Sequence, residues 1–171
     1  MIQIAIPLVT AFKNTATKAW AVDQNDKDLI GGQEGLRLKA YLDIAGVPTI
    51  GWGNTRYQNG TRVKMADTIS RAQADELLLF KMKEFEADVR RLTKVAINDN
   101  QGAALLSLIY NIGVGAFAGS TLLKKLNAGD YAGASAEFLK WNKVTQNGLK
   151  VVSKTLTNRR TIEQALFNKA A

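Results

Sequence analysis

Two carboxylic acids and a threonine, Glu34, Asp43 and Thr49, lie close together in the N-terminal third of the chain. Glycoside hydrolysis needs two carboxyl groups on opposite sides of a groove: one protonates the departing oxygen, and the other directs water or attacks from the other face. A threonine hydroxyl beside the second acid can hold that water. The competing interpretations are that Asp43 is an ordinary acceptor in a turn and that Thr49 is an ordinary strand residue. The elements that position these side chains therefore determine whether they can form a site.

The composition excludes several other chemistries. The chain has no histidine and no cysteine, and Ser-His, Cys-His and most zinc sites need an imidazole or a thiolate. Acid–base work near neutral pH must therefore fall to carboxylates, lysine or tyrosine.

Length and charge narrow the class of protein further. A chain of 171 residues predicts one domain, or two small lobes that share a core. The net charge of +8 indicates an anionic partner. Lysine and arginine are spread along the whole chain rather than gathered in one run, which argues against a nucleic-acid partner.

The first predicted elements surround the two acids. Residues 25–35 form a short helix that Gly35 ends, which places Glu34 at its C-terminal end. The negative end of the helix dipole raises the pKa of a carboxyl placed there, as a general acid requires. Residues 41–53 predict a small antiparallel hairpin or a three-stranded sheet that carries Asp43 and Thr49.

The remainder of the chain is predicted to be helical. Ser70 begins a capping box and a long amphipathic helix to about Leu92. An almost wholly apolar helix from about Asn98, with a glutamine three residues on, to Ile112, ended by Gly113, should lie at the centre of the core. Three further helices are expected at 120–127, 130–141 and 157–168.

The predicted fold class is α+β and mainly helical, with two lobes. A single domain, 25–171, is predicted to consist of a small β-sheet lobe (about 25–69), a long joining helix (about 70–92) and a helical lobe (about 93–171). The cleft between the lobes is the expected ligand site.

The first 24 residues form an extension whose role the sequence leaves open. The run from Met1 to Phe12 is apolar but too short to span a bilayer as a helix, and Lys13 follows it instead of preceding it as in a secretory signal. A packed helix, a membrane-surface segment and a weak export signal all remain as interpretations.

The residues around the acids resemble a known motif. Glu34-Gly-Leu-Arg-Leu-Lys-Ala-Tyr-Leu-Asp43, followed by Ile-Ala-Gly-Val-Pro-Thr49-Ile-Gly51-Trp-Gly53, is similar to the catalytic signature of the phage-type lysozymes, glycoside hydrolase family 24. That family has a Glu, an Asp nine positions later, a Thr six further on and then Gly-x-Gly. The resemblance continues through Tyr110-Asn-Ile-Gly113 and the C-terminal Arg159-Arg160, Glu163 and Phe167, and covers roughly 28–167.

The resemblance implies a function and a role for each site residue. The chain would hydrolyse the β-1,4 bond between N-acetylmuramic acid and N-acetylglucosamine in peptidoglycan, with Glu34 as the general acid. Asp43 and Thr49 would position the attacking water, and the anomeric configuration would invert. No cofactor or metal is needed, because the leaving group is protonated directly. A monomer made in the bacterial host's cytoplasm and acting on the wall in the periplasm is expected; association with the virion is left open.

Several residues carry secondary expectations. Asn54 stands where many family members have His, which implies altered local hydrogen bonding and a changed pH profile with activity retained. Arg159 or Arg160 is a candidate partner of Glu34 across the cleft, the alternative being a solvated surface arginine. Trp52 and Tyr41 are expected in the core.

Three alternatives remain beside the hydrolase. A non-catalytic peptidoglycan-binding module would use the same groove, but all three catalytic positions are filled. A basic membrane-permeabilising protein would act through the N-terminal segment. A lytic transglycosylase would need only the acid, whereas Asp43 and Thr49 serve a water and so favour hydrolysis.

Overall fold

The structure is a computed structural model that describes residues 24–43, 45–146 and 148–169. The side chains of residues 32–34, which include that of Glu34, lie outside the described part. The expectations for the extension, residues 1–24, concern a segment that lies, all but Gln24, outside the described residues. The division into domains stays a prediction.

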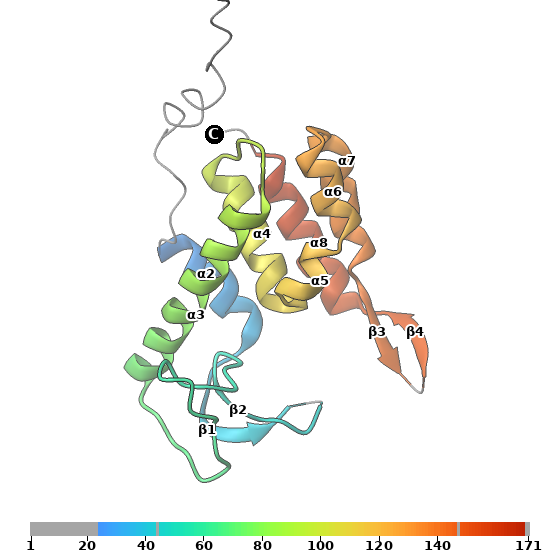
Figure 1. Cartoon of the computed structure of the whole chain (residues 1–171). Coiled ribbons are helices and arrows are strands. Elements are labelled where there is room, and N and C mark those ends of the chain that lie inside the picture. Colours follow the sequence, from blue (N-terminus) through green and yellow to red (C-terminus); the bar gives the residue numbers. More distant parts are fainter. Residues whose placement is uncertain (1–23, 44, 147, 170–171) are drawn as a thin grey trace, which may run out of the picture.

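The described chain has a small sheet at one end and a cluster of helices at the other, with α3 connecting them (Figure 1). This arrangement confirms the predicted α+β, mainly helical fold. In chain order the elements are α2 (Gln24–Glu34), β1 (Arg37–Leu42), β2 (Pro48–Gly51), α3 (Arg71–Leu92), α4 (Asp99–Ile112), α5 (Val114–Ala118), α6 (Thr121–Asn127), α7 (Tyr131–Glu137), a 3-10 turn η1 (Phe138–Lys140), β3 (Lys143–Gln146), β4 (Leu149–Val152) and α8 (Lys154–Phe167).

The long helix α3 begins as the sequence predicts. The Ser70 hydroxyl accepts a hydrogen bond from the backbone N–H of Gln73, and the Gln73 side chain accepts one from the backbone N–H of Ser70. These two bonds satisfy N–H groups that the first turn of a helix leaves without partners. The same box, made by Asn98 and Gln101, begins α4.

The structure confirms that the apolar helix α4 lies at the centre of the core. Buried side chains of α3 face α4, which is buried from Ala104 to Ile109 and forms the middle of the main core. The helix α2 contributes Ile30 to this core and contacts both α3 and α4. A second, smaller cluster lies under the small sheet and consists of Ile50, Val63 and Leu77.

The largest departure from the predicted elements is a second hairpin. Strands β3 and β4 pair antiparallel where the sequence indicates only a connection, and α8 begins at Lys154 instead of Thr157. In Figure 1 this hairpin projects from the helical cluster with no other element over it. Each strand has only four residues, too few for alternation to reveal them against the surrounding helices.

None of the helices between residues 24 and 169 is both long and apolar enough to cross a membrane.

Candidate active site

The position of Glu34 is fixed by the end of a helix. The helix α2 ends at Glu34, and Gly35 follows with a φ of 70°, a left-handed conformation that glycine adopts at low cost. The strand β1 begins two residues later, at Arg37. The chain thus passes directly from Glu34 into the sheet that carries the other two predicted residues.

Asp43 anchors the turn between β1 and β2. One of its carboxylate oxygens, Oδ1, accepts hydrogen bonds from the backbone N–H groups of Ala45 at 2.8 Å and Val47 at 2.9 Å. Its own backbone N–H donates to the Val47 carbonyl at 3.0 Å. Among the described residues none donates a hydrogen bond to the second oxygen, Oδ2. The turn therefore fixes the carboxylate by one oxygen, and the other receives no hydrogen bond from the described part of the chain.

Thr49 lies on the same face of this hairpin as Asp43. Tyr41 pairs with Thr49 and Asp43 with Val47, and residues two apart on a strand point to the same side. The Thr49 hydroxyl donates to the Val47 carbonyl at 2.9 Å, and its side chain is 2% exposed. Because its proton is committed, the Thr49 oxygen is available to a ligand only as an acceptor.

The Gly-x-Gly segment that follows Thr49 packs tightly on α3. Gly51 has a φ of 66°, and a Cβ there would lie 3.4 Å from Asn54 Oδ1 and 3.5 Å from Ala74 Cβ. Trp52 is buried, which confirms its predicted place in the core, and its indole N–H donates to Asp75 at 2.9 Å. The fixed chain after Gly51 keeps Thr49 in register.

Tyr41 does not belong to the core, so its predicted burial is wrong. It is half-buried and lies outside both core clusters. The strand β1 lies at the surface, and the guanidinium carbon of Arg37 is 4.7 Å from the centre of the Tyr41 ring. A cation over the ring face stabilises it there without burial.

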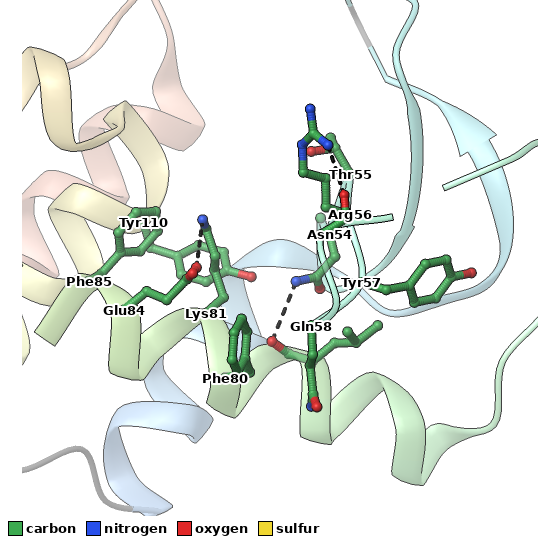
Figure 2. A pocket seen from close by; sticks show the side chains of 13 residues that line it. Asn54, Thr55, Arg56, Tyr57, Gln58, Phe80, Lys81, Glu84, Phe85 and Tyr110 are labelled. Carbon is green, nitrogen blue, oxygen red and sulfur yellow. Dashed lines mark hydrogen bonds and ion pairs between the residues drawn. The ribbon is translucent and has the colours of Figure 1, made fainter. Parts of the chain in front are cut away.

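A cavity of about 230 Å³ opens between the two lobes (Figure 2). Residues 53–60 of the small lobe form one wall, and α3 together with Tyr110 of α4 forms the other. On the second wall, the rings of Phe85 and Tyr110 meet edge to face at 5.9 Å, and Lys81 Nζ lies 4.5 Å from the centre of the Phe85 ring. Aromatic surface beside a few polar groups is typical of small-ligand sites.

Tyr110 also ties the lobes together. Its hydroxyl donates to the Trp52 carbonyl at 3.0 Å, across 58 positions of sequence. Among the described lining residues only Gly53, which ends the predicted catalytic signature, and Asn54 were singled out beside the predicted site in the sequence, and neither Asp43 nor Thr49 lines the cavity. Lys81 and Glu84 look like an ordinary surface pair in the sequence, and only the tyrosine hydroxyl in a mainly apolar helix offers a signal.

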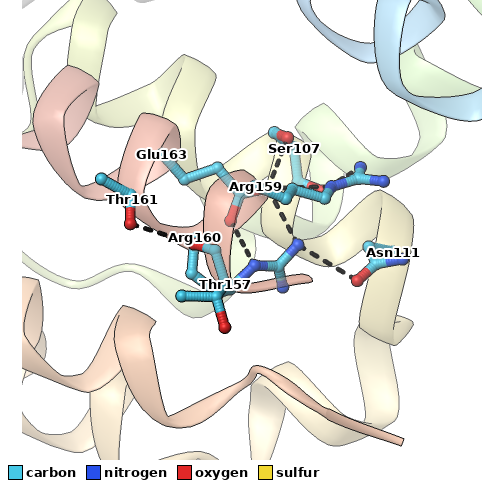
Figure 3. Close-up of polar contacts among 7 residues, drawn as sticks. All are labelled: Ser107, Asn111, Thr157, Arg159, Arg160, Thr161 and Glu163. Carbon is cyan, nitrogen blue, oxygen red and sulfur yellow. Dashed lines mark hydrogen bonds and ion pairs between the residues drawn. The ribbon is translucent and has the colours of Figure 1, made fainter. Parts of the chain in front are cut away.

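Arg159 and Arg160 are buried, so the alternative of a solvated surface arginine is wrong for both. Their side chains are 7% and 0% exposed, and both contact the fully buried Glu163 (Figure 3). The Glu163 carboxylate accepts from the Ser107 hydroxyl at 2.6 Å, and Arg160 also donates to Asn111 at 3.1 Å. The proposed partnership of either arginine with Glu34 stays a prediction, because the Glu34 side chain lies outside the described part.

The electrostatics of Glu163 combine opposing effects. Burial is the largest effect and raises the pKa of its carboxyl above the ordinary value, although Arg160, the Ser107 hydroxyl and Arg159 act in the opposite direction. The distances of 3.2 Å to Arg159 and 2.9 Å to Arg160 are those of a carboxylate shared between two guanidinium groups. This cluster connects α8 to α4 through charge as well as apolar packing.

Asn54 is held mainly through its backbone. Its N–H and carbonyl both pair with Ile50 at 2.9 Å, and its side chain is 6% exposed. The Asn54 amide donates weakly to the Leu77 carbonyl at 3.5 Å. The effect of this residue on the pH profile stays a prediction.

Tyr57 beside the cavity provides a pH-dependent contact. Burial and the hydrogen bond to Asp67 raise the pKa of Tyr57 from its ordinary 10.0 to about 12. The hydroxyl donates to Asp67 Oδ2 at 2.8 Å, and hydrogen bonds from the Lys64 backbone N–H and from Tyr57 lower the pKa of Asp67. Protonated Tyr57 and ionised Asp67 therefore stabilise each other.

A spectrophotometric titration of the four tyrosines tests this contact. A tyrosine whose folded pKa is raised contributes stability that is present below pH 10 and lost as the pH rises towards 12. We expect Tyr57→Phe to remove a phenol that titrates near pH 12, and Asp67→Asn to shift that titration to lower pH. An unchanged absorbance change near pH 12 in Tyr57→Phe would contradict the assignment.

Among residues 24–43, 45–146 and 148–169, no group of three or more acidic side chains is placed to hold a metal ion.

Two lobes, a cavity between them and an acid-bearing hairpin are the features expected of a lysozyme-type glycoside hydrolase. An endolysin of Acyrthosiphon pisum secondary endosymbiont phage 1 is 46% identical over 142 residues, which are 83% of this chain and 94% of the relative. An endolysin of Salmonella phage P22 is 43% identical over 135 residues, 79% of this chain and 89% of the relative. The solved structure of an endolysin from Escherichia coli O157:H7 phage FAHEc1 has a TM-score of 0.79 at 41% identity and covers 86% of this chain and 93% of its own.

The profile of the phage lysozyme family matches residues 31–163, and the chain belongs to that family. This confirms the resemblance carried by the Glu34 to Gly53 motif. It also confirms the predicted enzyme class, a lysozyme that hydrolyses peptidoglycan, and disfavours the non-catalytic alternatives.

Proposed function

We propose that Glu34, Asp43 and Thr49 carry the hydrolysis of the β-1,4 bond between N-acetylmuramic acid and N-acetylglucosamine in peptidoglycan. The observation that carries the proposal is the position of Asp43 and Thr49 on the same face of the β1–β2 hairpin. Asp43 uses one carboxylate oxygen in the turn and keeps the other to bind water. Thr49 uses its hydroxyl hydrogen in the turn and keeps the oxygen as an acceptor for water.

The hydrogen bonds at these two residues favour one orientation of that water. The Thr49 hydroxyl donates its own hydrogen to the Val47 carbonyl, so its oxygen can accept a hydrogen bond from the water. The second oxygen of Asp43 accepts the other hydrogen bond of the water. A water that donates to both has a lone pair left for the anomeric carbon, and Asp43 takes the proton as the new bond forms.

Glu34 supplies the complementary step. Its place at the end of α2, three residues before the start of β1, brings it close in the chain to the sheet that carries Asp43. Glu34 gives its proton to the glycosidic oxygen, and the C–O bond breaks as water attacks from the opposite face. The product has an inverted anomeric centre, because no sugar–enzyme ester forms.

The proposed setting is lysis of a bacterial host late in phage infection. The enzyme would be made in the host cytoplasm and act on the wall from the periplasm as a monomer. Its net charge of +8 suits a polyanionic envelope.

Mass analysis of digested, purified peptidoglycan tests the proposal. We expect the wild type to release fragments with ordinary reducing ends, and Asp43→Asn to lower their rate of release by about a hundredfold or more, the usual contribution of a general base. The matched control is Asp99→Asn, an exposed acid in the first turn of α4, which should keep the wild-type rate.

The products separate the alternatives. Anhydro ends would indicate a transglycosylase and leave Asp43 and Thr49 without their role. If the wild type released no fragments, the chain would instead be a peptidoglycan-binding or membrane-active protein.

A further inference from the structure

The β3–β4 hairpin stands apart from every element of the proposed active site. All eight of its strand residues are exposed, and it projects from the helical cluster beside the start of α8 (Figure 1). A two-stranded hairpin without packing on either face is only marginally stable in water. A hairpin that contributes so little to the core invites a role at the surface.

The register sorts the hairpin into two faces. Lys143 pairs with Val152 and Thr145 with Lys150, so both lysines lie on one face, on opposite strands. We call this the lysine face. The other face carries Val144, Gln146, Leu149 and Val151.

The charge around the hairpin has a single sign. From residue 138 to 154 the chain has four lysines and no acidic residue. Within the described chain, Lys143 and Lys150 form no ion pair, whereas the nearest acid before the hairpin, Glu137, pairs with Lys125 and Lys140. The lysine face is therefore a local cationic surface whose charge no described neighbour neutralises.

We infer that the lysine face binds the carboxylates of the short peptides carried by the glycan strands of the wall. This inference rests on the proposed function, which makes peptidoglycan the substrate. Those peptides bear free carboxylates along the whole polymer, and a second contact on the same chain raises the local concentration of substrate at the cleft.

A lipid surface fits the hairpin less well than a wall peptide. The strands β3 and β4 contain no aromatic residue, the type that anchors segments at a membrane interface. The face opposite the lysine face has only three aliphatic side chains, which offer little apolar area to insert into a membrane.

The test compares Lys143→Gln/Lys150→Gln with the full-length wild type on suspended, purified sacculi. We expect the apparent KM to rise about fivefold and kcat to stay unchanged, because that is the loss of affinity expected when two exposed ion pairs are removed. On sacculi whose carboxylates have been converted to amides, the wild type should show the same raised KM as the variant. The difference between the two proteins should vanish in high salt, because exposed charges are screened.

The control is Lys83→Gln/Lys94→Gln, which removes the same charge from two exposed lysines on and after α3. A hairpin variant that behaves like this control, or a wild-type KM that ignores amidation, would overturn the inference. So would a variant that keeps its KM on sacculi but loses binding to vesicles containing phosphatidylglycerol. Release of reducing ends by the wild type is measured in the same assay, so failure of the proposed function is recognised separately.

Discussion

Glu34→Gln is expected to lower kcat on purified peptidoglycan by about three orders of magnitude and to leave KM within a factor of about two. Glutamine keeps the size of the side chain and can still donate a hydrogen bond, but it has no proton to transfer. General acid catalysis contributes about two to four orders of magnitude, so most of the rate is lost while binding of the glycan is retained. Counting new reducing ends at several substrate concentrations separates kcat from KM.

The control for this substitution is Glu76→Gln, the same change at an exposed acid of α3. It should leave both constants unchanged. If Glu34→Gln kept more than a tenth of the wild-type kcat, the proton for the leaving group would come from another residue. The role of Asp43 as base would then also need a new test, since the acid and the base were assigned as a pair.

Glu163→Ala is expected to reduce the free energy of unfolding by about 3–5 kcal/mol, the usual cost of removing one member of a buried ion pair. The substitution takes the shared carboxylate from Arg159 and Arg160, which are 7% and 0% exposed. Natural domains have only about 5–15 kcal/mol of stability in total, so a large part is lost. Urea unfolding followed by circular dichroism measures the change.

An exposed pair of the same spacing provides the comparison. Asp88 and Arg91 contact at 2.7 Å three residues apart, as Arg160 and Glu163 do, but their side chains are 26% and 64% exposed. Asp88→Ala should cost less than about 1 kcal/mol. Equal losses in the two variants would mean that burial adds nothing to the cluster. Glu163→Gln, which keeps the shape and removes the charge, isolates the electrostatic part.

Local signals explain how much of the fold the sequence could predict. Ser70 and Asn98 are each followed three residues later by glutamine, and each begins a helix at the predicted place. Gly35 and Gly113 end α2 and α4 as expected, since both adopt positive φ. These features depend on neighbours within one helical turn, so no tertiary information is required.

The features that the sequence could not predict depend on distant partners. Tyr110 reaches the Trp52 carbonyl across 58 positions, and the cavity wall brings residues 53–60 against α3. The sequence of Arg159, Arg160 and Glu163 looks like an exposed helical face, and only contact with Ser107 of α4 makes it a buried cluster. The strands β3 and β4 pair only with each other and bury nothing, so no apolar pattern marks them.

The contact of α2 with α4 has a consequence for how the enzyme is made. Ile30 belongs to a core whose other members extend to Phe138 and Phe167, so its partners are synthesised long after it. A ribosome releases the chain from the N-terminus, and long-range contacts of this kind form late. The segment that ends in Glu34 can dock only when α4 has emerged. A nascent or truncated chain that stops before residue 99 therefore has all three proposed catalytic residues but lacks the helix α4 against which Ile30 packs.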